Sequence, residues 1–298
     1  MGLTLWPSAP PAATVMSNPR KCRLNTREDQ PIAPGGTLML EHKKAIVYGG
    51  GGAIGGQIAR VFAGQGARVY LAGRTASALS TVAADIGTLG REPAETAVVD
   101  VLDEASVNAF AAQVGDLDIC VNAVGLDGGA QGMPLIEMSA DTVVGPIADA
   151  ARAAYNTAKA AAVHMTDGVI IMLSTPMARM PAATTGPFGS ASAAVETMAR
   201  QLAAELGPRG TRVVCLRLTG IPETALRLGS LTERLWRDAA ARLGKSFEEV
   251  AEAAGAGSPL GRPLTVARVA EVAAFVASDR ASALTGTVLN VTAGAVVD

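Results

Sequence analysis

The fold is decided by one glycine-rich stretch, Tyr48-Gly49-Gly50-Gly51-Gly52-Ala53-Ile54-Gly55. It directly follows an apolar run typical of a buried strand, 45–48, and it leads into a segment with helical spacing, in which Ile54, Ile58 and Phe62 share one face. Glycines in such a turn let the backbone approach a pyrophosphate, whose charge then faces the free N–H groups of the helix N-terminus. The order of strand, glycine turn and helix therefore predicts a dinucleotide-binding site.

Short apolar runs alternate with alanine-rich helical stretches over the rest of the chain. Each run has the length and composition of a buried parallel strand, and the stretches between them repeat apolar residues with helical spacing. This alternation predicts an α/β fold, a Rossmann-type doubly wound parallel sheet of about seven strands. The predicted strands lie at 45–48, 68–71, 97–99, 119–121, 169–173, 213–218 and 288–291.

The second predicted strand ends in Leu71-Ala72-Gly73-Arg74. An acidic residue at this point would bind the ribose 2′-hydroxyl of NAD, whereas the Arg74 guanidinium suits the 2′-phosphate of NADP through charge-assisted, bidentate hydrogen bonds. The sequence therefore favours NADP(H) as the cofactor. The alternative is a solvated Arg74 in a protein that still accepts NAD(H).

Two segments interrupt the alternation. Residues 1–38 contain six prolines and no period of 2 or 3.6, which predicts a disordered leader; a start codon assigned too early and a docking arm both explain it. Residues 220–262 form a helical insertion, with helices expected at 233–243 and 247–254, where such folds often carry a substrate lid. A helical hairpin without that role has the same pattern. Residues 39–298 as a whole are predicted to form one domain.

The composition argues against several classes of protein. The 298 residues carry a net charge of −2 and no basic cluster, which argues against nucleic-acid binding. No apolar stretch approaches the roughly 18 residues of a membrane span, and the N-terminus lacks the pattern of a signal peptide. Cys120 and Cys215 lie in apolar, strand-like runs, and Cys22 is far from both, so we expect reduced thiols in a cytoplasmic protein.

The chain resembles the short-chain dehydrogenase/reductase family from about Lys44 to Asp298. The family's glycine motif is present, with Tyr48 in place of its threonine and Ala53 in place of its middle glycine, and Gly52 permits a related glycine spacing. The C-terminal third fits best. Further matching segments are Asn-Ala-Val-Gly at 122–125, Pro-Leu-Gly-Arg at 259–262, and the segments 272–279, 284–286 and 288–291.

The resemblance implies which residues contact the dinucleotide. In the family the glycine turn holds the pyrophosphate, and the segment that corresponds to 99–101 contacts adenine. The segment after the sixth strand departs from the family's Pro-Gly and reads Leu-Thr-Gly-Ile-Pro-Glu-Thr at 218–224. The implied cofactor-binding residues are Gly49, Gly51, Gly52, Ala53, Ile54, Gly55, Arg74, Asp100, Val101, Asn122, Ala123, Gly125, Ile221 and Thr224.

The same resemblance implies a departure at the catalytic positions. Family members use the tyrosine of a Tyr-x-x-x-Lys motif to exchange the substrate proton, the lysine to lower the tyrosine pKa and hold the nicotinamide ribose, and an upstream serine to bind the substrate oxygen. Alignment of the fifth strand puts Thr175 at the serine position, Phe188 at the tyrosine and Ser192 at the lysine, while the relay asparagine falls near Ala150. Phe188 has no ionisable proton and Ser192 carries no charge. We therefore expect the usual acid–base pair to be absent.

Other polar residues are candidates for a substitute role. Tyr155 and Lys159 satisfy Tyr-x-x-x-Lys as a string, but they precede the fifth strand whereas the family's pair follows it, so a surface position on the preceding helix is expected. His164 is expected to cap that helix. The remaining candidates are Asp127, Asp149, Arg179 and Arg217. We expect them in loops or at strand ends, and the alternative for each is a structural or solvated role.

Three hypotheses for the function remain open. The first is an atypical NADP(H)-dependent oxidoreductase whose small organic substrate, such as a conjugated or iminium-like acceptor, needs no tyrosine proton. The second is a non-catalytic dinucleotide-binding or assembly protein, in which Phe188 fills the gap above the nicotinamide. The third is a non-redox isomerase, lyase or cyclase. No metal is expected. The alanine-rich stretch 150–162 favours close helix packing, and the resemblance implies a homodimer or homotetramer.

Overall fold

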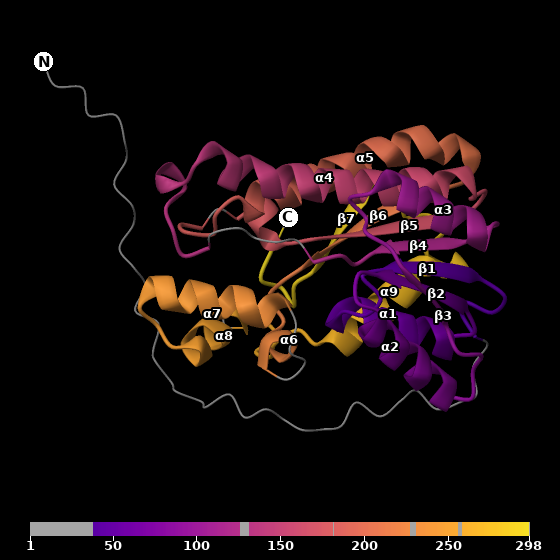
Figure 1. Cartoon of the computed structure of the whole chain (residues 1–298), viewed down its shortest axis with the longest axis horizontal. Helices are drawn as coiled ribbons and strands as arrows, with labels where there is room; N and C mark the ends of the chain where they lie inside the picture. Colours follow the sequence, from indigo (N-terminus) through magenta and orange to yellow (C-terminus); the bar gives the residue numbers. More distant parts are fainter. Residues whose placement is uncertain (1–37, 126–130, 181, 227–230, 256–257, 298) are drawn as a thin grey trace, which may run out of the picture. The chain divides into compact units, whose positions relative to one another are not determined.

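The computed structural model describes residues 38–125, 131–180, 182–226, 231–255 and 258–297. A single sheet of seven parallel strands, in the order β3-β2-β1-β4-β5-β6-β7, forms its centre (Figure 1). This confirms the predicted doubly wound sheet, and each predicted strand overlaps an observed one. The strands are β1 (Lys44–Tyr48), β2 (Arg68–Gly73), β3 (Glu95–Val98), β4 (Ile119–Asn122), β5 (Val169–Ser174), β6 (Arg212–Leu218) and β7 (Thr287–Val291).

Helices cover both faces of the sheet (Figure 1). One face packs against α1, α2 and α9, and the other against α3, α4 and α5. Side-chain caps at Asp103, Ser139 and Thr265 begin α3, α4 and α9. The helices are α1 (Ala53–Gly64), α2 (Ala76–Thr88), α3 (Glu104–Val114), α4 (Ala140–Val163), α5 (Phe188–Leu206), α6 (Pro222–Leu226), α7 (Leu231–Leu243), α8 (Phe247–Gly255) and α9 (Val266–Ala277), with short 3₁₀ turns η1 (Leu135–Glu137), η2 (Pro176–Ala178), η3 (Gly207–Arg209) and η4 (Asp279–Ala281).

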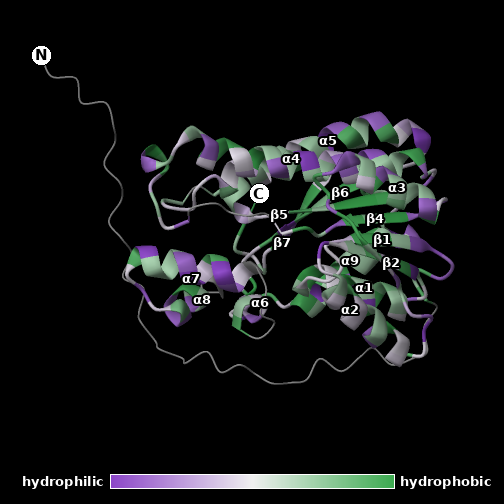
Figure 2. Cartoon of the chain, viewed as in Figure 1, coloured by the Kyte–Doolittle hydropathy of each residue, from purple (hydrophilic) through white to green (hydrophobic). Residues whose placement is uncertain are grey.

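The core is divided by the sheet into two layers. Successive side chains of a strand point to opposite faces, so Ala45 and Val47 of β1 join one hydrophobic cluster and Ile46 joins the other. Because helices cover both faces, the central strands β1, β4 and β5 consist mainly of buried apolar residues (Figure 2). Cys120 and Cys215 are free thiols in this core, as expected, and burial raises the pKa of each to about 12. Both thiols are therefore uncharged at neutral pH.

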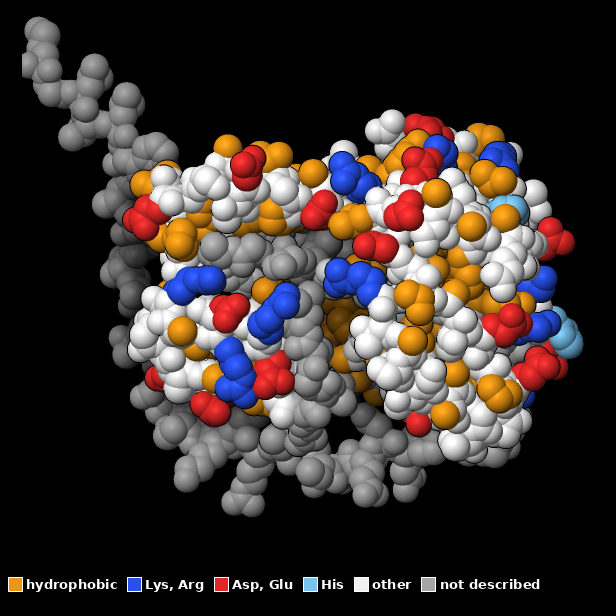
Figure 3. Space-filling model, in the orientation of Figure 1, with side chains coloured by type: hydrophobic (Ala, Val, Ile, Leu, Met, Phe, Trp, Pro, Cys, Tyr) orange, Lys and Arg blue, Asp and Glu red, His pale blue; other side chains and the backbone are white. Residues whose placement is uncertain are grey.

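Helices are present at both places where the insertion is expected to be helical. They are α7 and α8, which follow the short α6 after β6, and Arg237 of α7 stacks over the ring of Phe247 at 4.2 Å from its centroid. The face drawn in Figure 3 is hollowed between this segment and the part of the molecule that carries the sheet, with hydrophobic side chains on the floor. The predicted leader lies outside the described residues, apart from its last residue.

The carboxyl ends of all seven strands lie at one edge of the sheet because the strands are parallel. The chain moves outward from β1 to β3 and then returns to place β4 beside β1, so the strand order reverses between β1 and β4. Ligands of such sheets bind at this edge, in the crevice where the order reverses. The glycine turn, Arg74 and Thr175 directly follow β1, β2 and β5, and they therefore belong to the same edge.

Candidate active site

The glycine turn follows a backbone path that side chains would block. Gly49 has a φ of 76°, and a Cβ there would lie 2.6 Å from the carbonyl oxygen of Ala123. A Cβ on Gly55 would overlap the carbonyl oxygen of Gly49. Gly52 is the N-cap residue of α1 and has no side chain to cap the first-turn N–H groups, so these donors are left for a ligand that binds at this end of the helix. The turn therefore fits the pyrophosphate of a dinucleotide.

A cation and a second helix N-terminus meet at the end of β2. Arg74 is exposed, and within the described part of the chain its guanidinium has no hydrogen bond or ion pair. Thr75 is the N-cap residue of α2 and makes no side-chain capping bond, so the first N–H groups of that helix also lack a side-chain cap. An exposed guanidinium beside uncapped N–H donors is an arrangement suited to a phosphate group.

The turns after β3 and β4 are held by α4. Asn156 donates from Nδ2 to the carbonyl oxygen of Val101 at 2.9 Å. The Asn122 amide donates to Thr157 Oγ1 at 3.1 Å and accepts from the N–H of Val124 at 3.1 Å. These bonds tie the ends of β3 and β4 to α4 and fix the backbone of both turns.

The remaining predicted cofactor residues also follow strands at this edge. Asp100 accepts the N–H of Leu102 at 3.0 Å and shapes the turn after β3, and Gly125 lies in the turn after β4. Ile221 is buried just before α6, and Thr224 Oγ1 donates to its carbonyl oxygen at 2.7 Å. The glycine turn and the start of α1 contain Gly51, Ala53 and Ile54.

Tyr48, at the end of β1, belongs to the core and not to the site. Its ring lies edge-on to Phe110 with the centroids 6.2 Å apart, and its hydroxyl has no hydrogen-bond partner among the described residues. Burial, and to a smaller extent the Cys120 thiol, raises the pKa of Tyr48 far above its ordinary value. The hydroxyl is therefore a neutral group of the packed layer beneath α3 and α4.

Thr175 and Ser192 meet at the carboxyl end of β5. Their hydroxyl oxygens are 2.9 Å apart and share a hydrogen bond. Ser192 is fully buried whereas Thr175 is partly exposed, so Thr175 presents the pair to a ligand. Phe188 is the first residue of α5, one helical turn before Ser192, and is half-buried. The three predicted catalytic positions thus come together, and none of them carries an ionisable side chain.

Tyr155 and Lys159 lie on the outer face of α4. Lys159 donates from Nζ to Glu104 Oε1 of α3 at 2.6 Å, which raises the pKa of Lys159, and its ammonium lies 5.6 Å from the centroid of the Tyr155 ring. Both side chains are exposed, as expected for this string. The other two of the chain's three tyrosines, Tyr48 and Tyr70, are buried on β1 and β2. All three tyrosines therefore lie on elements other than β5 and α5.

Arg217 points into the core, so it is not available as the anion contact considered from the sequence. Its guanidinium donates to both carboxylate oxygens of Glu196, at 2.8 and 2.7 Å, and to Asn290 Oδ1 at 2.6 Å. Ser174 Oγ donates to Glu196 Oε1 at 2.8 Å. Sequence reasoning missed Glu196, although an acid four residues after Ser192, on the buried face of α5, is a signal that could have identified it.

The other candidate polar residues are scattered. Asp149 was expected in a loop or at a strand end, which is wrong, because α4 continues through Pro146 and carries Asp149 on its exposed side. Arg179 is exposed just after η2, and His164 is the C-cap residue of α4, as expected. Asp127 lies outside the described residues.

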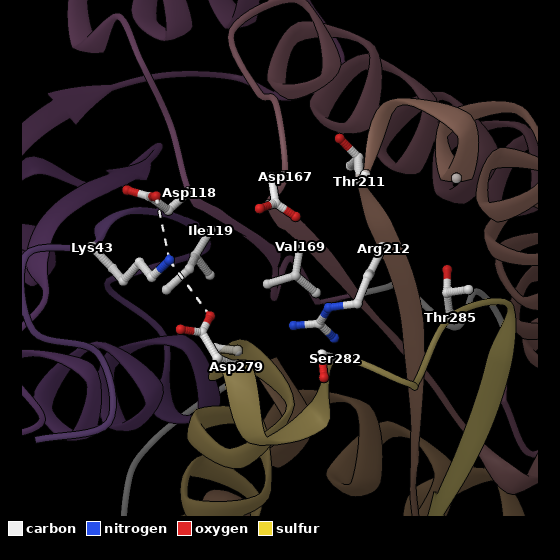
Figure 4. Close-up of a pocket in the computed structure, with 14 residues that line it drawn as sticks. Lys43, Asp118, Ile119, Asp167, Val169, Thr211, Arg212, Asp279, Ser282 and Thr285 are labelled. Atoms are coloured by element: carbon white, nitrogen blue, oxygen red, sulfur yellow. Dashed lines mark ion pairs between the residues drawn. The ribbon is translucent and has the colours of Figure 1, made fainter. Parts of the chain in front are cut away.

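A cavity of about 350 Å³ lies at the opposite edge of the sheet, where the strands begin (Figure 4). Lys43 Nζ lies between the carboxylates of Asp118, at 3.8 Å, and Asp279, at 3.6 Å. Arg212 donates to carbonyl oxygens at and beyond the C-terminal end of α9, and burial lowers the pKa of Arg212. The basic groups of this cavity are thus already paired, and it lies away from the predicted catalytic positions.

Two kinds of feature are absent from the described ranges. They contain no group of three or more His, Cys, Asp and Glu side chains arranged to hold a metal ion. None of their helices has both the length and the apolar character needed to cross a membrane.

Comparisons with known proteins agree on the kind of protein that this chain is similar to. The sequence model of the enoyl-(acyl carrier protein) reductase family matches residues 51–296. A Mycobacterium tuberculosis protein named as an uncharacterised oxidoreductase is 32% identical over 267 residues, covering 86% of this chain and 92% of the relative. The structure of a short-chain dehydrogenase/reductase family protein matches with 31% identity and a TM-score of 0.69, over 86% of this chain and 98% of that one. A short-chain dehydrogenase from Burkholderia cenocepacia, solved in complex with NADP, matches with 26% identity and a TM-score of 0.72, over 86% and 99%.

Proposed function

Because the chain belongs to the short-chain dehydrogenase/reductase family, we propose that it is an NADP(H)-dependent oxidoreductase that acts without the family's tyrosine and lysine. The oxidoreductase class is common to the named relatives. Beyond that class, we propose NADP(H) as the cofactor, an altered active site and a substrate that needs no tyrosine proton. The observation that carries it is the hydroxyl pair of Thr175 and Ser192, with Phe188 one turn away.

The donor groups at the sheet edge support NADP(H). The uncapped N–H groups of α1 would hold the pyrophosphate, and Arg74 with the N-terminus of α2 would hold the 2′-phosphate. No acidic residue follows β2, where NAD-binding proteins use one for the ribose 2′-hydroxyl. The similar Burkholderia cenocepacia dehydrogenase was solved with NADP.

The side chains at the end of β5 favour a substrate that needs no acid to accept a hydride. Bound NADPH would supply the hydride, which adds to the β-carbon of an α,β-unsaturated carbonyl or to the carbon of an iminium group. In the conjugated case the electron pair of the C=C bond would move towards the carbonyl oxygen, to which the Thr175 hydroxyl would donate a hydrogen bond. Water would then supply the proton to the α-carbon. Loss of a general acid costs about 10²–10⁴-fold in rate, so reduction of a simple ketone would be slow.

Two hydrogen bonds support a lid role for the α6–α8 segment. Arg242 of α7 donates to the carbonyl oxygen of Gln131, in the segment after β4, at 2.5 Å. The N–H of the next residue, Gly132, donates to the carbonyl oxygen of Thr184, in the segment before α5, at 2.7 Å. The proposed lid is thereby linked to the segments that follow β4 and β5.

A homodimer or homotetramer through α4 and α5 is part of the proposal. On α4, Tyr155 is 45% exposed and Val163 is 70% exposed, although the helix is otherwise alanine-rich and closely packed against α5. Exposed apolar side chains on a regular helix face favour association with a second copy.

The first test measures cofactor binding and acceptor preference together. Calorimetric titration should give a micromolar dissociation constant for NADPH and a weaker one for NADH, and Arg74→Ala should raise the NADPH constant about tenfold through the loss of charge-assisted hydrogen bonds. NADPH oxidation should be faster with 2-cyclohexen-1-one than with its saturated match, cyclohexanone. If neither NADPH nor NADH binds, the proposal is refuted. Equal rates with the two ketones would refute the substrate class.

A further inference from the structure

A buried polar network lies directly behind the Thr175 and Ser192 hydroxyls. It contains Glu196 of α5, Arg217 of β6, Asn290 of β7 and Ser174, the last residue of β5. The side chains of Arg217 and Glu196 are only 2% and 3% exposed. The network therefore joins the carboxyl ends of three neighbouring strands to α5. Its Arg217–Glu196 ion pair is almost fully buried, and Asn290 is half-buried.

Stability alone is a weak explanation for this pair. Removal of two charges from water costs several kcal/mol per ion, and well-packed apolar residues in place of a buried ion pair are often neutral or stabilising. Here three directional hydrogen bonds offset the free-energy cost of burying the Glu196 carboxylate, which accepts two bonds from Arg217 and one from Ser174. A directional network fixes positions, whereas apolar packing would only fill the same space.

The network is connected to both hydroxyls of the site. Ser174 is the chain neighbour of Thr175, and Glu196 lies one helical turn after Ser192. Ser174 and Arg217 are also the last register pair of β5 with β6, so their side-chain bonds continue the connection where the backbone ladder ends. Movement of Glu196 would thus change the spacing between the end of β5 and the first turns of α5.

We infer that Glu196 and Arg217 are positioning residues, which hold the end of β5 against α5 so that the Thr175 hydroxyl faces the substrate oxygen. This inference rests on the proposed function. The pair acts through Ser174 and Ser192 and has no contact with substrate in this assignment. Its effect on turnover must therefore pass through Thr175.

A double-mutant cycle tests the inference. Glu196→Gln keeps the shape of the side chain and should lower kcat for NADPH oxidation by 2-cyclohexen-1-one about ten- to hundredfold, since small misplacements near the reacting atoms cost this much. The dissociation constant of NADPH should change less than about twofold, because the network lies away from the phosphate-binding turns. In a Thr175→Ala background the same change should have little further effect.

The matched control is Glu205→Gln, the same substitution on the exposed side of the same helix, where Glu205 accepts a bond from Gln201. It should leave kcat unchanged. An equal loss from Glu196→Gln with and without Thr175, or no loss at all, would overturn the inference. If Glu196→Gln does not fold, Ser174→Ala removes only the end of the network nearest Thr175 and should show the same coupling.

Amide hydrogen exchange separates this inference from the proposed function. Glu196→Gln should speed exchange in the peptide that contains Ser174 and Thr175, and Glu205→Gln should not. If the wild-type protein neither binds NADPH nor oxidises it, the proposed function fails, while the exchange result still decides whether Glu196 orders this segment. Unchanged exchange in Glu196→Gln would overturn the positioning role.

Discussion

The two ends of the site differ in what they are made of. The cofactor end, formed by the glycine turn and the residues after β2, depends on backbone geometry: Gly49 and Gly55 leave no room for a Cβ, and uncapped helix N–H groups are its donors. The chemistry end, formed by Thr175, Phe188 and Ser192, depends on side chains alone. A backbone-built site is part of the fold and persists with it. A side-chain site can change its chemistry while the fold stays the same.

We expect the largest effect, a gain of activity at the chemistry end, from the double change Phe188→Tyr with Ser192→Lys. It would restore an ionisable proton and the ammonium that lowers its pKa, and should raise NADPH-dependent reduction of cyclohexanone by about 10²–10⁴-fold. The increase is to be measured as the initial rate at saturating NADPH. Phe188→Leu with Ser192→Lys is the control without the phenol. NADPH binding with no gain in rate would show that these positions are wrongly aligned.

Gly55→Ala should disrupt the cofactor end and have a smaller effect, measured as a loss of NADPH affinity. Its methyl group would collide with the carbonyl oxygen of Gly49, and overpacking of this kind costs about 1–3 kcal/mol, which corresponds to roughly a ten- to hundredfold loss of NADPH affinity if the turn shifts to relieve it. Calorimetric titration and a thermal melt measure the two consequences. Gly64→Ala, in the same helix with nothing near the new methyl group, should leave affinity unchanged. Equal behaviour of the two variants would contradict the backbone account.

Tyr155→Phe and Lys159→Met should have the smallest effect. Both side chains lie on the outer face of α4, where Lys159 contacts the Tyr155 ring and Glu104 of α3. NADPH affinity and the rate with 2-cyclohexen-1-one should each change less than about twofold, as is usual for surface substitutions. A loss of activity in either variant, with NADPH affinity retained, would assign the missing acid to this string and remove the contrast between the two ends.

The fold and the cofactor end could be largely predicted from the sequence. Strands buried on both faces are mostly apolar, and the apolar residues of surface helices recur every three to four positions. Both kinds of element are therefore visible as a local pattern in the sequence. Glycine carries a similar signal, because at Gly49 no other residue fits both the positive φ and the nearby carbonyl of Ala123. Asp149 was misplaced for a local reason, since α4 continues through Pro146, a residue that usually ends helices.

The sequence by itself thus determined the parallel sheet, its order of elements and the glycine turn, because these depend on periodicity and on backbone sterics. Only the tertiary structure decided which polar side chains meet. Thr175 shares a hydrogen bond with Ser192, 17 residues away, and Arg217 is paired with Glu196, 21 residues away. A hydrogen bond requires atoms within about 3 Å in a suitable direction, and that distance depends on how distant segments pack, which no local pattern records.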